Sequence, residues 1–233
     1  MVMWEMGLVG WLVGMAVNAL GDGLPRALNV PSAARAQPRR APAMWRWLAA
    51  RETHWDGIAV ELLTAFWFMW LAARLNLGFD FGVMAILGVF FLLVALIDLR
   101  YQLVFDAVTF PAALAILALQ IVSGANGLVV LLGGAFGFAI FAAAAFLRPG
   151  DLGGGDVKLA TVIGLLFGFP YALWALLIGV LAGGVVVAGA LITRRGGWQT
   201  RIPYAPFLCF GALSALVYNP VVALYPVAVW RAW

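Results

Sequence analysis

Long runs of apolar residues, broken by short polar segments, form the dominant pattern of the sequence. A helix needs about 17–25 mainly apolar residues to cross a bilayer. Eight runs approach that length, at residues 3–20, 57–74, 78–97, 107–123, 127–147, 157–169, 171–192 and 205–230. The pattern therefore predicts an all-α polytopic membrane protein with about eight transmembrane helices.

The ends of the sixth and eighth runs are the least defined. The sixth run is short and follows a glycine-rich stretch, a combination that also fits a partly re-entrant segment. In the eighth run, Asn219-Pro220 interrupts helical hydrogen bonding because proline lacks an amide hydrogen. An earlier end to the eighth helix is therefore an alternative.

The composition of the 233-residue chain excludes an ordinary soluble domain. Hydrophobic residues make up 65% of the chain, charged residues 10%, and the mean hydropathy is +1.03. So few polar residues cannot cover a water-facing surface, and we expect one membrane domain over residues 1–233. The single cysteine, Cys209, excludes an intramolecular disulfide and a multi-cysteine zinc site. The first residues carry no basic group, which favours a retained first span over a cleaved signal.

Basic residues gather in alternate connections between the apolar runs. They are Arg26, Arg35, Arg39, Arg40, Arg46, Arg51, Arg100, Arg148, Lys158, Arg194, Arg195 and Arg201. Loops rich in Lys and Arg stay in the cytoplasm, so eight spans with both termini outside the cytoplasm satisfy the pattern. This explains the net charge of +4 without a nucleic-acid partner. Residues 21–56 form a Pro- and Arg-rich cytoplasmic loop, whose arginines either enforce the topology or contact anionic membrane lipids.

Two of the ten acidic residues, Asp98 and Asp156, stand where an apolar run meets a cytoplasmic connection. Ionisable groups at such depth are costly and usually face a polar cavity, which indicates a function. Two adjacent carboxylates raise each other's proton affinity, so that one stays protonated while the other ionises. The ionised group can then activate a water against a peptide carbonyl that the protonated group polarises. The sequence does not assign which aspartate takes which role.

The glycines before Asp156 fit the same chemistry. Gly153 and Gly155 lack a Cβ, so a substrate backbone can approach the carboxylate closely. The alternative is that the glycines only connect two helices and that Asp156 is the N-cap of the second.

Four segments resemble those of the type IV prepilin leader peptidases. The sequence from Gly153 to Leu159 is similar to the GxGDxKL motif of that family, and Asp98-Leu99-Arg100 followed by Asp106 resembles its first catalytic segment. The family usually has Leu-Pro or Ile-Pro before the second aspartate, whereas Val104-Phe105 stands here. The other two segments resemble the family's ELLT and IP[FY]xPF motifs and lie at Val60-Glu61-Leu62-Leu63-Thr64 and Ile202-Pro203-Tyr204-Ala205-Pro206-Phe207.

The resemblance implies an aspartic endopeptidase of the inner (cytoplasmic) membrane with Asp98 and Asp156 as its catalytic pair. Its substrates would be prepilin or pseudopilin-like proteins of type IV pili or protein secretion, cut at the cytoplasmic face to remove a short basic leader. Proteolysis of this kind needs no metal or other cofactor. The oligomeric state is not predicted.

The first loop departs from the family pattern. Many bacterial members also methylate the new N-terminus and carry paired CxxC motifs in this loop, which suit zinc. Residues 21–56 contain no cysteine, although Asn18-Ala19-Leu20 resembles the preceding helix end of the family. Methylation, which would require S-adenosylmethionine, is therefore in doubt.

Several residues near the predicted pair have two interpretations each. Lys158 either stabilises charge in the pair or extends to lipid phosphates. Asp106 orients water or substrate, or serves a helix N-terminus. Glu61 recognises a basic leader or faces the membrane interface, and the single histidine, His54, is assigned no role.

The main rival function is that of a transporter or ion-binding protein. Paired aspartates at mid-membrane bind protons or cations, but Asp98 and Asp156 are predicted at cytoplasmic helix ends. A silent scaffold of a secretion assembly and a peptidase for archaeal preflagellin are further alternatives.

Overall fold

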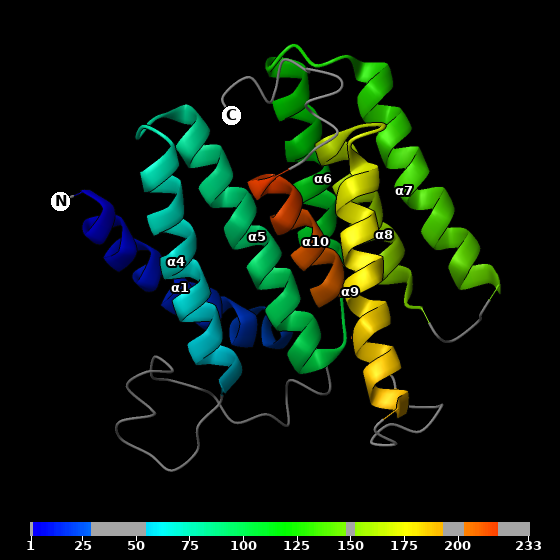
Figure 1. Ribbon diagram of the computed structural model, residues 1–233, viewed down its shortest axis with the longest axis horizontal. Coiled ribbons are helices and arrows are strands. Elements are labelled where there is room, and N and C mark those ends of the chain that lie inside the picture. The colour runs from blue at the N-terminus through cyan, green and yellow to red at the C-terminus, as the bar shows by residue number, and fades with distance from the viewer. Residues whose placement is uncertain (1, 29–54, 148–151, 193–202, 219–233) are drawn as a thin grey trace. The chain divides into compact units, whose positions relative to one another are not determined.

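A computed structural model describes residues 2–28, 55–147, 152–192 and 203–218 of the chain. The described part is all-helical, as predicted (Figure 1). Its eight helices are α1 (Val2–Ala27), α4 (Trp55–Arg74), α5 (Phe79–Tyr101), α6 (Asp106–Val122), α7 (Gly127–Leu147), α8 (Gly154–Phe167), α9 (Ala172–Ile192) and α10 (Ala205–Val217). The predictions for His54, Arg148 and most other basic loop residues lie outside the described ranges.

Each predicted apolar run contains one helix, but the ends of several helices differ from the prediction. α5 continues to Tyr101 instead of ending at residue 97. α1 continues to Ala27 instead of ending at residue 20. α8 begins at Gly154 and ends at Phe167, before Gly168, whose positive φ of 70° does not continue a helix. α10 ends at Val217 instead of residue 230, because Tyr218 is extended with φ −153° and ψ 121°.

The longer α1 removes residues 21–27 from the predicted first loop. Proline at position 25 lies in the last turn, where it deletes only its own hydrogen bond, and Leu28 N–H still donates to Leu24 O at 3.0 Å. Asp22 is buried in this added part of the helix. The polar residues of this stretch are therefore structural parts of α1.

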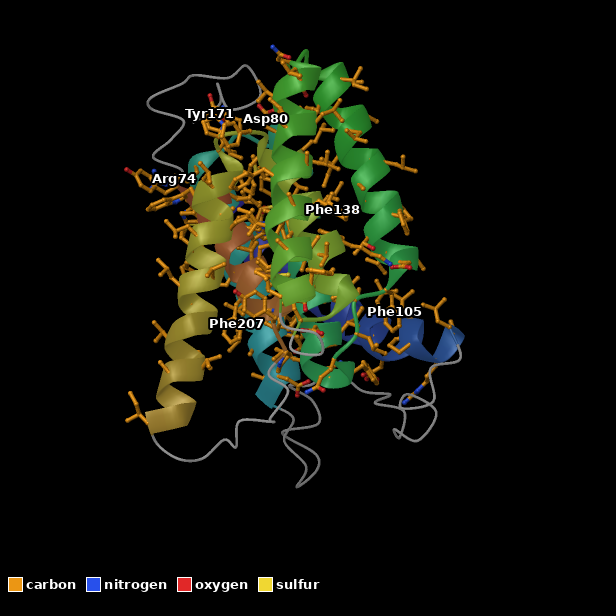
Figure 2. All side chains as sticks on the ribbon, turned by 90° about the vertical axis from the view of Figure 1, so that its right-hand side faces the viewer. Arg74, Asp80, Phe105, Phe138, Tyr171 and Phe207 are labelled. Carbon is orange, nitrogen blue, oxygen red and sulfur yellow. The ribbon has the colours of Figure 1, made fainter. Side chains whose placement is uncertain are left out.

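Five of the described helices, α1, α4, α5, α7 and α9, are long and apolar enough to cross a membrane. α6, α8 and α10 are shorter, with 17, 14 and 13 residues. Large apolar side chains are exposed on many helices, and Figure 2 shows Phe138 of α7, which is 55% exposed. The chain is a multi-pass membrane protein.

Contacts divide the chain into two compact units, Met1–Tyr101 and Gln102–Trp233. Unit 1 contains α1, α4 and α5. α1 packs against α4 at glycines, because a Cβ on Gly10 or Gly14 would lie 2.7 Å from Thr64 O or 2.8 Å from Glu61 Cα. α5 is the most buried helix of this unit. The prediction of one membrane domain stays a prediction.

Unit 2 contains α6 to α10. α7 and α8 meet backbone to backbone at Gly133 and Gly164, where neither position has room for a Cβ. At the C-terminal end of α8, Gln120 of α6 donates from Nε2 to Leu165 O and Leu166 O at 3.3 and 2.5 Å. Figure 2 places Phe105, which precedes α6, at the opposite end of this unit from Tyr171.

Candidate active site

Asp98 lies in the last turn of α5, at the polar end of unit 1. Its side chain is buried, with 5% of the residue exposed. The helix forms here because the run from Phe81 to Ile97 is apolar on every side and unbroken by proline. The apolar helix thus carries a carboxylate into the protein interior, where ionisation is costly.

Arg100, two residues later, joins the ends of all three helices of unit 1. Its Nε donates to Asp56 Oδ2 of α4 at 2.5 Å, and its Nη1 donates to Asp22 Oδ1 of α1 at 2.9 Å. Its Nη2 donates to Asn18 Oδ1 at 3.0 Å. The Arg100 side chain is only 6% exposed, so these partners replace the water that its charge would otherwise bind.

Glu61 belongs to the same network and is almost fully buried, with 2% exposed. Its Oε1 accepts from Asn18 Nδ2 at 3.0 Å, and its Oε2 accepts from Trp11 Nε1 at 3.2 Å. The interpretation as an interface-facing carboxylate is therefore wrong, because apolar packing of α1 on α4 encloses the group. Recognition of a basic leader by Glu61 stays a prediction.

Asp156 lies in the first turn of α8, in unit 2, just before the apolar stretch that begins at Val157. Its Oδ2 accepts from the backbone N–H of Gly153 at 3.2 Å, and the residue is 8% exposed. The N-cap of α8 is Gly153, so the expectation that Asp156 is itself the N-cap is wrong. Burial raises the pKa of Asp156 to about 6, against the lowering effect of the Gly153 hydrogen bond.

Packing inside unit 2 leaves no room for a side chain at Gly155. A Cβ at this position would lie 2.7 Å from Val104 Cβ. Val104 belongs to the connection that leads into α6, so this connection rests directly on the glycine-rich turn. Close approach of a substrate backbone to Gly153 and Gly155 stays a prediction.

Lys158 and Asp106 form an ion pair that links the first turns of α8 and α6. Lys158 Nζ lies 2.5 Å from Asp106 Oδ1 and 5.6 Å from the centre of the Phe110 ring. Both side chains are well exposed, at 43% and 55%, so the pair is accessible to solvent. Two of the residues predicted to support the catalytic pair therefore contact each other, and their catalytic roles stay predictions.

Tyr204, in the IPYAPF segment, is the N-cap of α10 and interacts electrostatically with Asp156. Burial and the Asp156 charge raise the pKa of its phenol, which therefore stays protonated. The Tyr204 ring packs at 6.0 Å from that of Phe141 in α7 and at 6.2 Å from that of Phe207. Sequence reasoning used Tyr204 only as part of a motif.

Sequence reasoning also missed the network around Arg100. It interpreted Arg100 as a marker of topology and gave Asp22 and Asp56 no role. The partners of Arg100 lie 44 to 82 residues away in sequence, so no local pattern joins them. The one available signal was the presence of oppositely charged residues at three apolar helix ends.

The fold and these sites define a class: a helical membrane protein with buried aspartates at the ends of two apolar helices. Comparison with known sequences specifies the class further. Residues 85–188, which include Asp98 and Asp156, match the type IV leader peptidase family. A prepilin leader peptidase/N-methyltransferase of Bacillus subtilis (strain 168) is 28% identical over 169 residues, covering 72% of this chain and 68% of the relative. No solved structure matches significantly.

Residues 85–188 are therefore similar to the type IV leader peptidase family, and the two comparisons support prepilin peptidase activity. The predicted resemblance is thereby confirmed. Asp98 and Asp156 lie in different compact units, and their action as a pair stays a prediction.

Proposed function

We propose that the protein removes the leader peptide of type IV prepilin-like substrates, with Asp98 and Asp156 as its catalytic carboxyls. The observation that carries the proposal is that both aspartates are buried at helix ends and both fall within the residues matched by the family. The name of the Bacillus relative, a prepilin leader peptidase/N-methyltransferase, supports prepilin as the substrate class.

The proposed reaction needs one ionised and one protonated carboxyl. The ionised aspartate accepts a proton from water as the water oxygen attacks the peptide carbonyl carbon, and the protonated aspartate donates a hydrogen bond to the carbonyl oxygen. Collapse of the tetrahedral intermediate breaks the C–N bond, and the leaving amine takes up the proton that the first aspartate accepted from water, which restores the starting protonation of the pair. The raised pKa of Asp156 favours Asp156 as the protonated member.

The proposed topology has eight spans, both termini outside the cytoplasm and the catalytic aspartates at the cytoplasmic face of the inner membrane. The alternation of basic and nearly uncharged connections supports it. Lipids are expected to surround the exposed apolar side chains. In this orientation a basic leader would stay in the cytoplasm while its apolar helix enters the bilayer.

Cleavage of a prepilin by the purified protein in lipid tests this function. The wild type should release the leader, and Asp98→Asn and Asp156→Asn should each lower the rate by about 10³-fold or more, because each removes a group that acts in the transition state. Asp80→Asn is a matched control, since Asp80 lies in the exposed first turn of α5. Product mass locates the cut.

Three results would contradict the proposal in different ways. Full activity of one folded variant would remove that aspartate from the mechanism. A loss of activity in Asp80→Asn equal to that in Asp98→Asn would indicate a general effect of carboxylate removal. A folded wild type that cleaves no prepilin would restore the transporter or ion-binding alternative.

The proposal is confined to proteolysis. The name of the Bacillus relative includes N-methyltransfer, but residues 21–56 hold no cysteine that would supply a CxxC zinc site. Adding S-adenosylmethionine to the cleavage reaction tests methylation, because a methylated product gains about 14 Da. An unchanged product mass is the expected result.

A further inference from the structure

Arg100 lies in the same turn of α5 as Asp98, and its contacts fix that turn to the other two helices of unit 1. The guanidinium donates to Asp56 of α4 and to Asp22 and Asn18 of α1. Its three donor atoms thus each hold a different side chain. A Cβ on Gly21 of α1 would lie 3.4 Å from Arg100 Nη1, so α1 passes close to the guanidinium.

The spacing of Arg100 and Asp98 couples their orientations. Successive residues of an α-helix are rotated by about 100°, so residues two apart project to nearly opposite sides, about 3 Å apart along the axis. Arg100 therefore binds α1 and α4 on one side of α5 while Asp98 projects from the other. Any rotation of this last turn that moved Asp98 would break the three hydrogen bonds of Arg100.

The chemistry of the guanidinium suits this task. Its donors form a rigid planar fork, and Nε, Nη1 and Nη2 are all used here. Lysine would keep the charge but has a single mobile nitrogen, which cannot hold three partners in fixed directions. Asn18 also donates to Glu61 and to Gly57 O, so the partners of Arg100 are themselves held in place.

We propose that Arg100 is the positioning residue of Asp98: it fixes the rotation of the last turn of α5 and thereby the direction of the catalytic carboxyl. The inference rests on the proposed function for its catalytic consequence. Arg100 thus does more than mark the topology, because its charge lies in the interior of unit 1.

Steady-state cleavage of prepilin by Arg100→Lys tests the proposal. We expect kcat to fall about tenfold or more while KM changes less than about threefold, because a small displacement of a catalytic group slows the chemical step. Arg74→Lys is the matched control, since Arg74 is exposed in the last turn of α4 in the same unit. A wild-type kcat in folded Arg100→Lys would overturn the proposal.

A second variant separates positioning from folding. Arg100→Gln removes the cation that donates to the buried Asp22 and the partly exposed Asp56 carboxylates, and this variant can fail to fold. Combining it with Asp22→Asn and Asp56→Asn removes the two negative charges that Arg100 contacts. Thermal unfolding should show recovered stability in the triple variant while kcat stays low. Recovery of stability and kcat together would mean that Arg100 acts only in folding, which contradicts the proposal.

Thiol labelling measures the position of residue 98 without any substrate. Asp98→Cys is placed in a Cys209→Ser background, and labelling by a water-soluble maleimide is compared with and without Arg100→Lys. Residue 98 is buried, so we expect slow labelling that becomes at least about fivefold faster with Arg100→Lys. Equal labelling rates would overturn the positioning role. If the wild type cleaves no prepilin, the proposed function fails while labelling still decides whether Arg100 fixes this turn.

Discussion

At the scale of single residues, burial of the Asp156 carboxyl favours its proposed role as the protonated catalytic group and lowers the stability of the folded protein at neutral pH. Burial raises its pKa from 3.8 to about 6, which favours the protonated form in the folded protein. Below pH 4 the carboxyl is protonated in both folded and unfolded chains. As the pH rises through 4 to 6, the unfolded chain ionises first, so the contribution of Asp156 to stability falls over this window.

Asp156→Asn should therefore inactivate the enzyme and stabilise it. We expect the variant to unfold at a higher temperature than wild type at pH 7.5 and at nearly the same temperature at pH 4, because asparagine does not titrate. Asparagine can still accept the hydrogen bond from Gly153 N–H. Thermal unfolding in detergent at the two pH values measures the difference. A variant less stable than wild type at pH 7.5 would show that the carboxylate contributes favourably.

The sequence predicted the location of the two aspartates because the signal for it is local, while their catalytic roles stay predictions. Asp98 and Asp156 interrupt or border apolar runs, so their placement at buried helix ends followed from the sequence. Glu61 and Lys158 were harder, because their partners Asn18 and Asp106 lie 43 and 52 residues away. The sequence contains both members of each pair but does not specify which helix faces bring them together.

At the scale of helices, glycines determine how closely neighbours approach. α7 and α8 touch through the backbones of Gly133 and Gly164, and backbone atoms cannot move aside as a side chain can. This packing holds α8, whose first turn carries Asp156. Helix existence was predictable from apolar run length, whereas the end of α1 was not, because contacts of Asp22 with α5 extend that helix.

Gly164→Ala should separate α7 from α8. We expect it to destabilise the protein by about 1–3 kcal/mol, the usual cost of overpacking a tight contact, and to slow cleavage through Asp156. Gly184→Ala is the control, because a Cβ at Gly184 of α9 would meet no atom within 4 Å. Thermal unfolding and cleavage rates compare the two variants. Equal stability of both would indicate that the α7 and α8 backbones adjust without cost.

At the scale of the whole molecule, the proposed mechanism requires groups from both compact units. Asp98 belongs to unit 1 and Asp156 to unit 2. The connection from Gln102 to Phe105 leads from α5 of unit 1 to α6 of unit 2. Gln102 has a positive φ of 53°, a conformation that costs most residues about 1–2 kcal/mol. The sequence motifs identified both aspartates, but a shared water depends on the distance between their carboxyl groups, which a motif does not give.

Cross-linking tests whether the two aspartates meet. Asp98→Cys with Asp156→Cys, in a Cys209→Ser background, should be joined by a bismaleimide that spans about 8–10 Å, since two carboxyls sharing a water must lie within such a reach. Asp80→Cys with Asp156→Cys is the control, because Asp80 lies in the first turn of α5 and Asp98 lies near the end of the helix. Mass spectrometry detects the intramolecular link. Linkage of the control pair alone would contradict the shared-water mechanism.

The short length of α8 has a consequence for the path of water toward Asp156. Its 14 residues extend about 21 Å, whereas the hydrocarbon core of a bilayer is about 30 Å thick. Ten of these residues are buried, so protein and not lipid surrounds the helix. In the proposed topology, water or polar chain must therefore fill about 9 Å of the core beyond the ends of α8. Because Asp156 lies in the first turn of this helix, the proposed topology brings hydration toward its carboxyl.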